Sequence, residues 1–275
     1  VNVQSCGACY VQFLGHADQM NEKEGGAPFE VVHITQQLLD VLKRLGDRVP
    51  WQRQVSRRVL LHAEGEEVHP TKREARDAII ETLNLIPGVE FVGLAADPSL
   101  GSPCTRAGSA RITVESKMGN EPVKFALEDI TAEQYRQVQA ELAAQARAVG
   151  ADVIATPHFT CHREWCKFAS DQLPVMYYQS LVAEALGIHI PDRFQILWRT
   201  GDPAKILELT RPHWESWGIG ESEAREMVKK FFVPRYASAV QRCPCEGDCF
   251  ATRVANSPAP CAGSTMDSAA MSTSD

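Results

Sequence analysis

The chain has 275 residues, with 35 acidic against 28 basic side chains and a formal net charge of −7. With 44% hydrophobic and 23% charged residues, and no apolar stretch of about 18 residues, the composition excludes wholesale disorder and a membrane span. The acidic balance and the lack of a dense Lys/Arg cluster argue against nucleic-acid binding.

The first clear helix and strand lie between residues 70 and 95. Thr71 and Glu74 form a capping box, which predicts a helix that runs to about Leu83. The apolar stretch VEFVGLA at residues 89–95 predicts a strand, and a loop that carries Cys104 follows it. This segment therefore reads as a helix, a strand and a cysteine-bearing loop.

The same order recurs after residue 130. Thr131 and Gln134 form a second capping box, and apolar residues at spacings of three and four predict a helix over 131–150. GADVIATP, which ends at Pro157, predicts a buried strand, and SLVAEALG predicts a further helix. Between them a loop carries His158, Cys161 and Cys166. Such alternation is typical of an α/β fold with a parallel sheet, in which ligands bind beyond the carboxyl ends of the strands.

The last third of the chain shows two kinds of composition. Residues 191–240 predict further helices, with Trp198, Trp214 and Trp217 as packing anchors. Residues 241–275 are rich in Ser, Ala, Pro and Thr and predict a disordered tail. This tail contains Cys243, Cys245 and Cys249, whose close spacing is compatible with metal capture and leaves their role open.

The nine cysteines indicate metal chemistry rather than disulfide bonding. Their number is odd, and no secretory signal is visible at the start of the sequence. We therefore expect a cytoplasmic protein whose thiolates bind a metal or cluster. His33, His62 and His69 show no arrangement with cysteines or carboxylates and are expected to be packing or surface residues.

An internal repeat relates the two cysteine-bearing regions. Residues 1–9 match residues 153–161 position for position, so that Cys6 aligns with His158 and Cys9 with Cys161. Residues 31–42 then match residues 175–186. The second copy has a helix before its strand, whereas the first copy starts within a strand. The pattern predicts that the front of the first copy is missing, and it divides the chain into 1–50, 51–190, 191–240 and 241–275.

These motifs resemble the cysteine-rich (CCG) domain family, over roughly residues 1–188. The residues that carry the resemblance are a Cys-x-x-Cys after a strand, IPGVEFVGL before a cysteine, and GADVIATP with LPV before a helix. The family includes the cysteine-rich subunit of heterodisulfide reductase and related subunits of succinate dehydrogenase and glycolate oxidase. The resemblance implies two pseudo-repeated α/β units with parallel-rich sheets, here followed by a helical extension, and cysteines that hold a noncubane 4Fe-4S cluster.

Carried over residue by residue, the resemblance implies two ligand sets. Cys6 and Cys9 form the complete Cys-x-x-Cys of the first copy and would bind the iron–sulfur cluster. In the second copy Gly65 stands at the first cysteine position, and the implied ligands are Cys104, His158 and Cys161. Imidazole with thiolates suits tetrahedral zinc or a cluster with mixed ligands.

The resemblance implies an oxidoreductase subunit of a heterodisulfide-reductase-like complex. Such a subunit passes electrons to or from a disulfide, a thiol or a quinone-linked partner, and it works with iron–sulfur or flavin-containing redox subunits. One alternative is a non-catalytic scaffold of the same family that binds zinc. Another is a dithiol oxidoreductase that uses Cys6 and Cys9 directly, although the sequence lacks a thioredoxin-type arrangement.

Overall fold

The computed structural model describes residues 1–4, 7–24, 29–62, 70–106, 130–170, 173–189, 191–234 and 236–240. No helix within these ranges is long and apolar enough to cross a membrane. Several sequence predictions lie outside them, namely those for Cys6, Gly65, His69 and the tail 241–275 with its cysteines. The chain divides into two compact units, one of Val1–Val123 with Glu141–Ile188 and one of Lys124–Ala140 with His189–Asp275.

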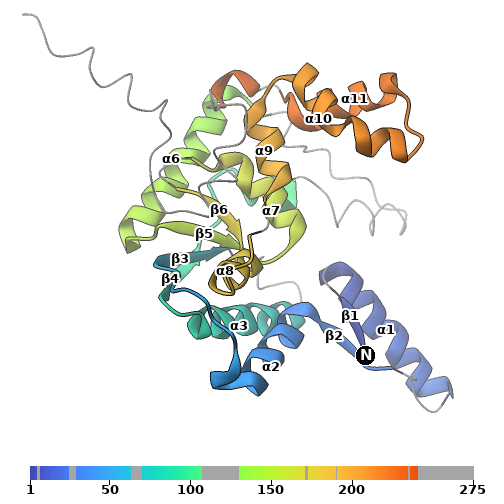
Figure 1. The fold of residues 1–275 in the computed structure, drawn as a ribbon, viewed down its shortest axis with the longest axis vertical. Coiled ribbons are helices and arrows are strands. Elements are labelled where there is room, and N and C mark those ends of the chain that lie inside the picture. The colour runs from blue at the N-terminus through green and yellow to red at the C-terminus, as the bar shows by residue number, and fades with distance from the viewer. Residues whose placement is uncertain are drawn as a thin grey trace, which may run out of the picture. The chain divides into compact units, whose positions relative to one another are not determined.

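A four-stranded parallel sheet lies at the centre of the first unit (Figure 1). Its spatial order is β4 (Val89–Ala95), β3 (Arg57–His62), β5 (Val153–Thr156) and β6 (Val175–Tyr177). The last four residues of β3 and all of β5 are buried, as expected for inner strands of a parallel sheet. The α/β prediction is therefore confirmed, and β4 has the predicted bounds.

Two predicted helices connect these strands. The helix predicted from Thr71 is α3 (Pro70–Leu85), between β3 and β4, and the helix predicted over 131–150 is α6 (Ala132–Val149). The second capping box forms: Gln134 N–H donates to Thr131 Oγ1 over 3.2 Å, and Thr131 N–H donates to Gln134 Oε1 over 2.8 Å. Gly150 follows α6 at a φ of 65°, the left-handed conformation typical of a residue after a helix.

The segments predicted as cysteine-bearing loops contain short helices. Cys104 lies in α4 (Pro103–Arg106), and Cys161 lies in α7 (Phe159–Trp165), which continues into the 3-10 turn η3 (Cys166–Phe168). The backbone N–H of His162 donates to the carbonyl of His158 over 2.8 Å and so closes the first turn of α7. The helix predicted from SLVAEALG is α8 (Tyr178–Ala185).

The first copy of the repeat forms a smaller parallel pair of strands. β1 (Asn2–Gln4) is followed by α1 (Gly7–Glu24), β2 (Val31–His33), α2 (Ile34–Leu45) and the turn η1 (Gly46–Arg48). α2 packs against α3, and the two helices lie side by side in Figure 1. The second copy has the same order of elements, with β5, α7, β6 and α8.

The strand pairing agrees with the repeat in register. Asn2, Val3 and Gln4 pair with Val31, Val32 and His33. The aligned residues of the second copy pair in the same way, Ile154 with Val175, Ala155 with Met176 and Thr156 with Tyr177. Because a shift of one residue would reverse which side chains face the helices, this agreement is a specific structural match between the copies.

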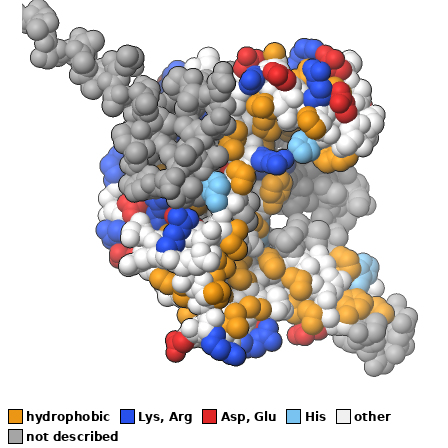
Figure 2. Space-filling view, viewed as in Figure 1, with side chains coloured by type: hydrophobic (Ala, Val, Ile, Leu, Met, Phe, Trp, Pro, Cys, Tyr) orange, Lys and Arg blue, Asp and Glu red, His pale blue; other side chains and the backbone are white. Residues whose placement is uncertain are grey.

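The second unit contains helices α9 (Arg193–Thr200), α10 (Pro203–Ser216) and α11 (Glu221–Phe232) and the turn η4 (Ala237–Ala239). α10 and α11 bury a small apolar cluster of Ile206, Leu207, Ala224 and Val228. Figure 2 shows acidic and basic side chains interspersed on the outside of these two helices. Of the predicted anchors, Trp198 is buried and Trp214 packs on the cluster, but the prediction for Trp217 is wrong, because its side chain is 75% exposed.

Candidate metal centre

Three side chains meet beyond the carboxyl ends of three neighbouring strands. His62 is the last residue of β3, Cys104 follows β4, and Cys161 follows β5. β4, which follows β3 in the chain, lies on one side of β3 in the sheet, and the later strand β5 lies on the other side. In open parallel sheets, ligands bind at such a reversal of strand order, just beyond the strand ends.

The ligand atoms of His62, Cys104 and Cys161 all lie within 4.8 Å of one another, and the three residues are buried. His62 Nε2 is 3.2 Å from Cys104 Sγ, and Ser102 Oγ lies 3.1 Å from the same sulfur. With Zn–S bonds of about 2.3 Å and Zn–N bonds of about 2.0 Å, the ligand atoms of a tetrahedral ion stand about 3.5–3.8 Å apart. Small side-chain movements therefore bring these three atoms to coordinating positions, and the group can hold a metal ion.

The His62 ring is fixed from one side by an aromatic residue of α7. The indole of Trp165 stacks on it, with ring centroids 4.0 Å apart and an angle of 29° between the planes. Both side chains are fully buried. The Nδ1 atom of His62 is also buried, and no described residue forms a hydrogen bond with it. The stacked indole and the contact of Nε2 with Cys104 Sγ hold the His62 ring with Nε2 at the thiols.

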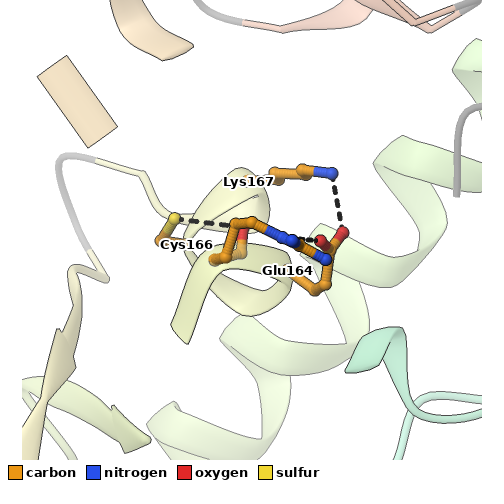
Figure 3. A network of polar contacts seen from close by, with 4 residues as sticks. Glu164, Cys166 and Lys167 are labelled. Carbon is orange, nitrogen blue, oxygen red and sulfur yellow. Dashed lines mark hydrogen bonds and ion pairs between the residues drawn. The ribbon is translucent and has the colours of Figure 1, made fainter. Parts of the chain in front are cut away.

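A buried ion-pair network holds the segment that carries Cys161 and Trp165. Figure 3 shows Glu164 between its partners: Lys167 Nζ lies 2.6 Å from Glu164 Oε2, and Arg163 Nε lies 2.5 Å from Glu164 Oε1. The side chains of Glu164 and Lys167 are 2% and 4% exposed. The Cys166 thiol donates to the carbonyl of Arg163 over 3.4 Å. These contacts join the end of α7 to η3, behind the ligand-bearing turn.

The site also influences a neighbouring tyrosine. Burial raises the pKa of Tyr177, at the end of β6, and the nearby Cys161 raises it further, while a hydrogen bond with the Gln179 side chain opposes the rise. Burial likewise raises the pKa of Tyr178. Tyr177 therefore stays protonated to a higher pH than an unperturbed tyrosine.

The structure brings together two of the three ligands predicted for the second copy. Cys104 and Cys161 lie in one group, but its third member is His62 rather than His158. The expectation that His62 has no arrangement with cysteines is wrong, because the fold brings it to both thiols. The sequence held one signal, since His62 ends the apolar run RVLLH and the carboxyl end of a strand is where ligands gather.

His158 lies next to Cys161 in sequence but contacts a different histidine. Its ring meets the edge of the His33 ring, with centroids 5.3 Å apart, and His33 also contacts Tyr10 at 5.3 Å. Whether His158 binds a metal stays a prediction. Two further side chains on this segment have contacts of their own: His162 Nδ1 lies 3.2 Å from Thr156 Oγ1, and the Cys166 thiol donates to the carbonyl of Arg163.

The cysteines predicted for the first copy are not part of the described site. Cys6 lies outside the described residues, and Cys9 lies in α1, where its side chain is outside the description. Their role as cluster ligands stays a prediction.

Comparisons with known proteins leave the family open. No protein-family model matches the chain, and neither the curated proteins nor the solved structures gave a match.

Proposed function

We propose that this chain is a metal-binding α/β protein in which His62, Cys104 and Cys161 hold one zinc ion. The observation that carries the proposal is the convergence of three buried ligand atoms within 4.8 Å. One imidazole with two thiolates is a donor set that zinc uses in proteins. The bound ion would supply a closed, redox-inactive link between the ends of β3, α4 and α7.

The spacing favours a single ion over a cluster in this copy. In an iron–sulfur cluster, two cysteine thiolates bind different irons, and the irons and bridging sulfides lie between them. The two cysteine sulfurs are therefore farther apart than two ligands of one ion. Here all three ligand atoms lie within 4.8 Å of one another, and His62 Nε2 is 3.2 Å from Cys104 Sγ. A structural zinc site has four ligands, and the described group supplies three of them.

Burial supports a stabilising role for this ion. His62 and Cys161 are fully buried and Cys104 is 5% exposed, which is typical of a structural site rather than of one open to a substrate. In this function the protein is a zinc-stabilised scaffold. This corresponds to the alternative of a non-catalytic, zinc-binding scaffold that the sequence analysis left open. Because metal binding and folding are coupled, removal of the ion lowers the free energy of unfolding.

The repeat favours a second function, that of an iron–sulfur redox subunit in a heterodisulfide-reductase-like complex. The equivalent pairing of β1 with β2 and of β5 with β6 supports a common plan for both copies. Cys9 then corresponds to Cys161, and Cys6 and Cys9 would bind a noncubane 4Fe-4S cluster. Such a subunit would exchange electrons with iron–sulfur or flavin-containing partners and act on a disulfide or thiol.

Metal analysis of the anaerobically purified full chain tests both functions. The zinc site predicts bound zinc in the wild type, and a fall in zinc affinity in His62→Ala that exceeds the ~10–100-fold cost of losing an outer-shell partner. The matched control is His213→Ala, because His213 is exposed on α10 and binds Arg193 instead. A chelator should lower the unfolding temperature of the wild type and of His213→Ala. It should leave that of His62→Ala unchanged, because this variant has lost a zinc ligand.

Three results would change the conclusion. Unaltered zinc binding in His62→Ala would refute the proposed site. Iron with labile sulfide, lost on Cys9→Ala replacement while zinc binding persists, would establish the second function beside the first. Iron lost on Cys104→Ala replacement would instead mean that the second copy binds a cluster.

A further inference from the structure

Cys104 and Cys161 form the one place among the described residues where two thiols share a metal-ligand group. They belong to different segments, α4 after β4 and α7 after β5, and these two helices pack against each other. Their sulfurs lie at most 4.8 Å apart, and a disulfide requires about 2.0 Å. The remaining distance is within reach of side-chain rotation and a small shift of the four-residue helix α4.

We propose that Cys104 and Cys161 are a redox modification site, at which a hydroperoxide converts the two thiols to a reversible disulfide and expels the bound metal. The expulsion rests on the proposed zinc site, whereas the disulfide needs only the two thiols. A disulfide uses both sulfur ligands, which leaves His62 as the single described donor of the group. One imidazole does not retain zinc, so oxidation and metal binding exclude each other.

The reaction balances with hydrogen peroxide as the oxidant. A sulfur of one cysteine breaks the O–O bond and becomes a sulfenic acid, with release of one water molecule. The second thiol attacks the sulfenic sulfur, the S–S bond forms and a second water molecule leaves. The free dithiol loses two electrons and two protons, and the peroxide takes up both. Where zinc holds the cysteines as thiolates, the two protons come from the solvent.

The order of the two steps follows from exposure. Cys104 is 5% exposed and Cys161 is fully buried, and we expect the oxidant to attack the sulfur of the more exposed residue first. Once Cys104 is oxidised, Cys161 already stands beside it, and the intramolecular step competes well with further oxidation.

The chain offers a matched control on the same segment. Cys166 follows α7, is 1% exposed and donates its thiol hydrogen to the carbonyl of Arg163 (Figure 3). Its burial resembles that of Cys161, but it is not a member of the group. If burial alone decided oxidation, Cys161 and Cys166 would react alike. The proposal instead predicts that only Cys161 forms a disulfide with Cys104.

The test uses the zinc-loaded, reduced full chain with added hydrogen peroxide. Zinc release is followed with a colorimetric chelator, and the oxidised protein is digested and mapped by mass spectrometry. We expect release of the zinc, a linked peptide pair that contains Cys104 and Cys161, and recovery of zinc binding after dithiothreitol. Cys166→Ser should behave like the wild type, and Cys161→Ser should accumulate a dimedone-trapped sulfenic acid on Cys104.

The outcomes separate this inference from the proposed function. Retained zinc after peroxide, a link to Cys166, or irreversible oxidation of Cys104 without a link in the wild type would overturn the inference. Peptide mapping of the wild type decides this even where a variant fails to fold. If the reduced protein binds no zinc but peroxide still links Cys104 to Cys161, the zinc site fails and the disulfide stands.

Discussion

The two copies of the strand–helix–strand–helix unit share their strand pairing but differ in what surrounds their first strand. β5 lies between β3 and β6, and all four of its residues are fully buried. β1 pairs with β2 alone among the described strands, and Val1 and Val3 are 77% and 42% exposed. The local pattern thus determines the pairing, while the neighbouring strands determine whether the copy has a buried centre.

A pair of ring contacts shows the same relation. Tyr10 contacts His33 in the first copy, and the aligned residues His162 and Tyr177 contact each other in the second, with centroids 5.3 Å and 6.1 Å apart. Tyrosine and histidine have exchanged places between the helix and the strand end. The contact is therefore a feature of the shared plan, whereas the group of His62, Cys104 and Cys161 depends on β3 and β4, which the second copy alone has beside it.

The largest expected difference between the copies is at Trp165 and the aligned Phe13. Trp165 is fully buried against His62, whereas Phe13 is 39% exposed. We expect Trp165→Ala to lower the free energy of unfolding by about 4 kcal/mol, as for other buried aromatic residues. Phe13→Ala should cost less than about 1 kcal/mol. Urea unfolding followed by circular dichroism measures both, and equal costs would mean that the copies are equally well packed.

The second largest effect concerns the ion pairs behind α7. The aligned positions of Glu164 and Lys167 in the first copy are Gln12 and Gly15, so this pair belongs to the second copy alone. Glu164→Gln leaves the buried Lys167 ammonium without its carboxylate and should cost about 3 kcal/mol.

An exposed pair of similar spacing is the control for this change. Glu226 binds Lys229 on α11, with side chains 68% and 57% exposed. Glu226→Gln should change stability by less than about 0.5 kcal/mol in the same urea experiment. A small loss for both variants would show that the Glu164 network does not hold α7 in place.

The smallest expected effect is on the pKa values of Tyr10 and Tyr177, the tyrosines of the two Tyr–His contacts. Burial raises the pKa of Tyr10, and Glu74 raises it further, whereas the second cause of the rise for Tyr177 is Cys161. A raised pKa in the folded state adds stability below the unfolded value of about 10 and loses it as pH rises through the folded pKa. Unfolding at pH above about 10 should therefore become easier.

Tyrosine titration by nuclear magnetic resonance separates the two causes. Glu74→Gln should lower the pKa of Tyr10 and leave that of Tyr177 unchanged. Cys161→Ser should lower the pKa of Tyr177 and leave that of Tyr10 unchanged. A common shift of both tyrosines in either variant would contradict separate surroundings.

Much of the fold could be predicted because its signals are local. The capping box at Thr131, the apolar run of β4 and the strand before Pro157 need only neighbours in sequence, and all three were predicted. Trp217 was predicted wrongly, because an aromatic residue in a helical stretch does not show which face of the helix is covered. The pairing register was not predicted, but the structure gives aligned strands of the two copies the same register.

The sequence by itself therefore determined the α/β class, the repeat, and Cys104 and Cys161 as neighbours at strand ends. It did not identify His62 as a ligand, because His62 comes near the two thiols only through the spatial order of the strands in the sheet. Chain order places β4 directly after β3 and β5 much later, but the sheet puts β3 between them. Hydrogen bonding between strands that are distant in sequence, rather than any local spacing, brings the imidazole to the two sulfurs.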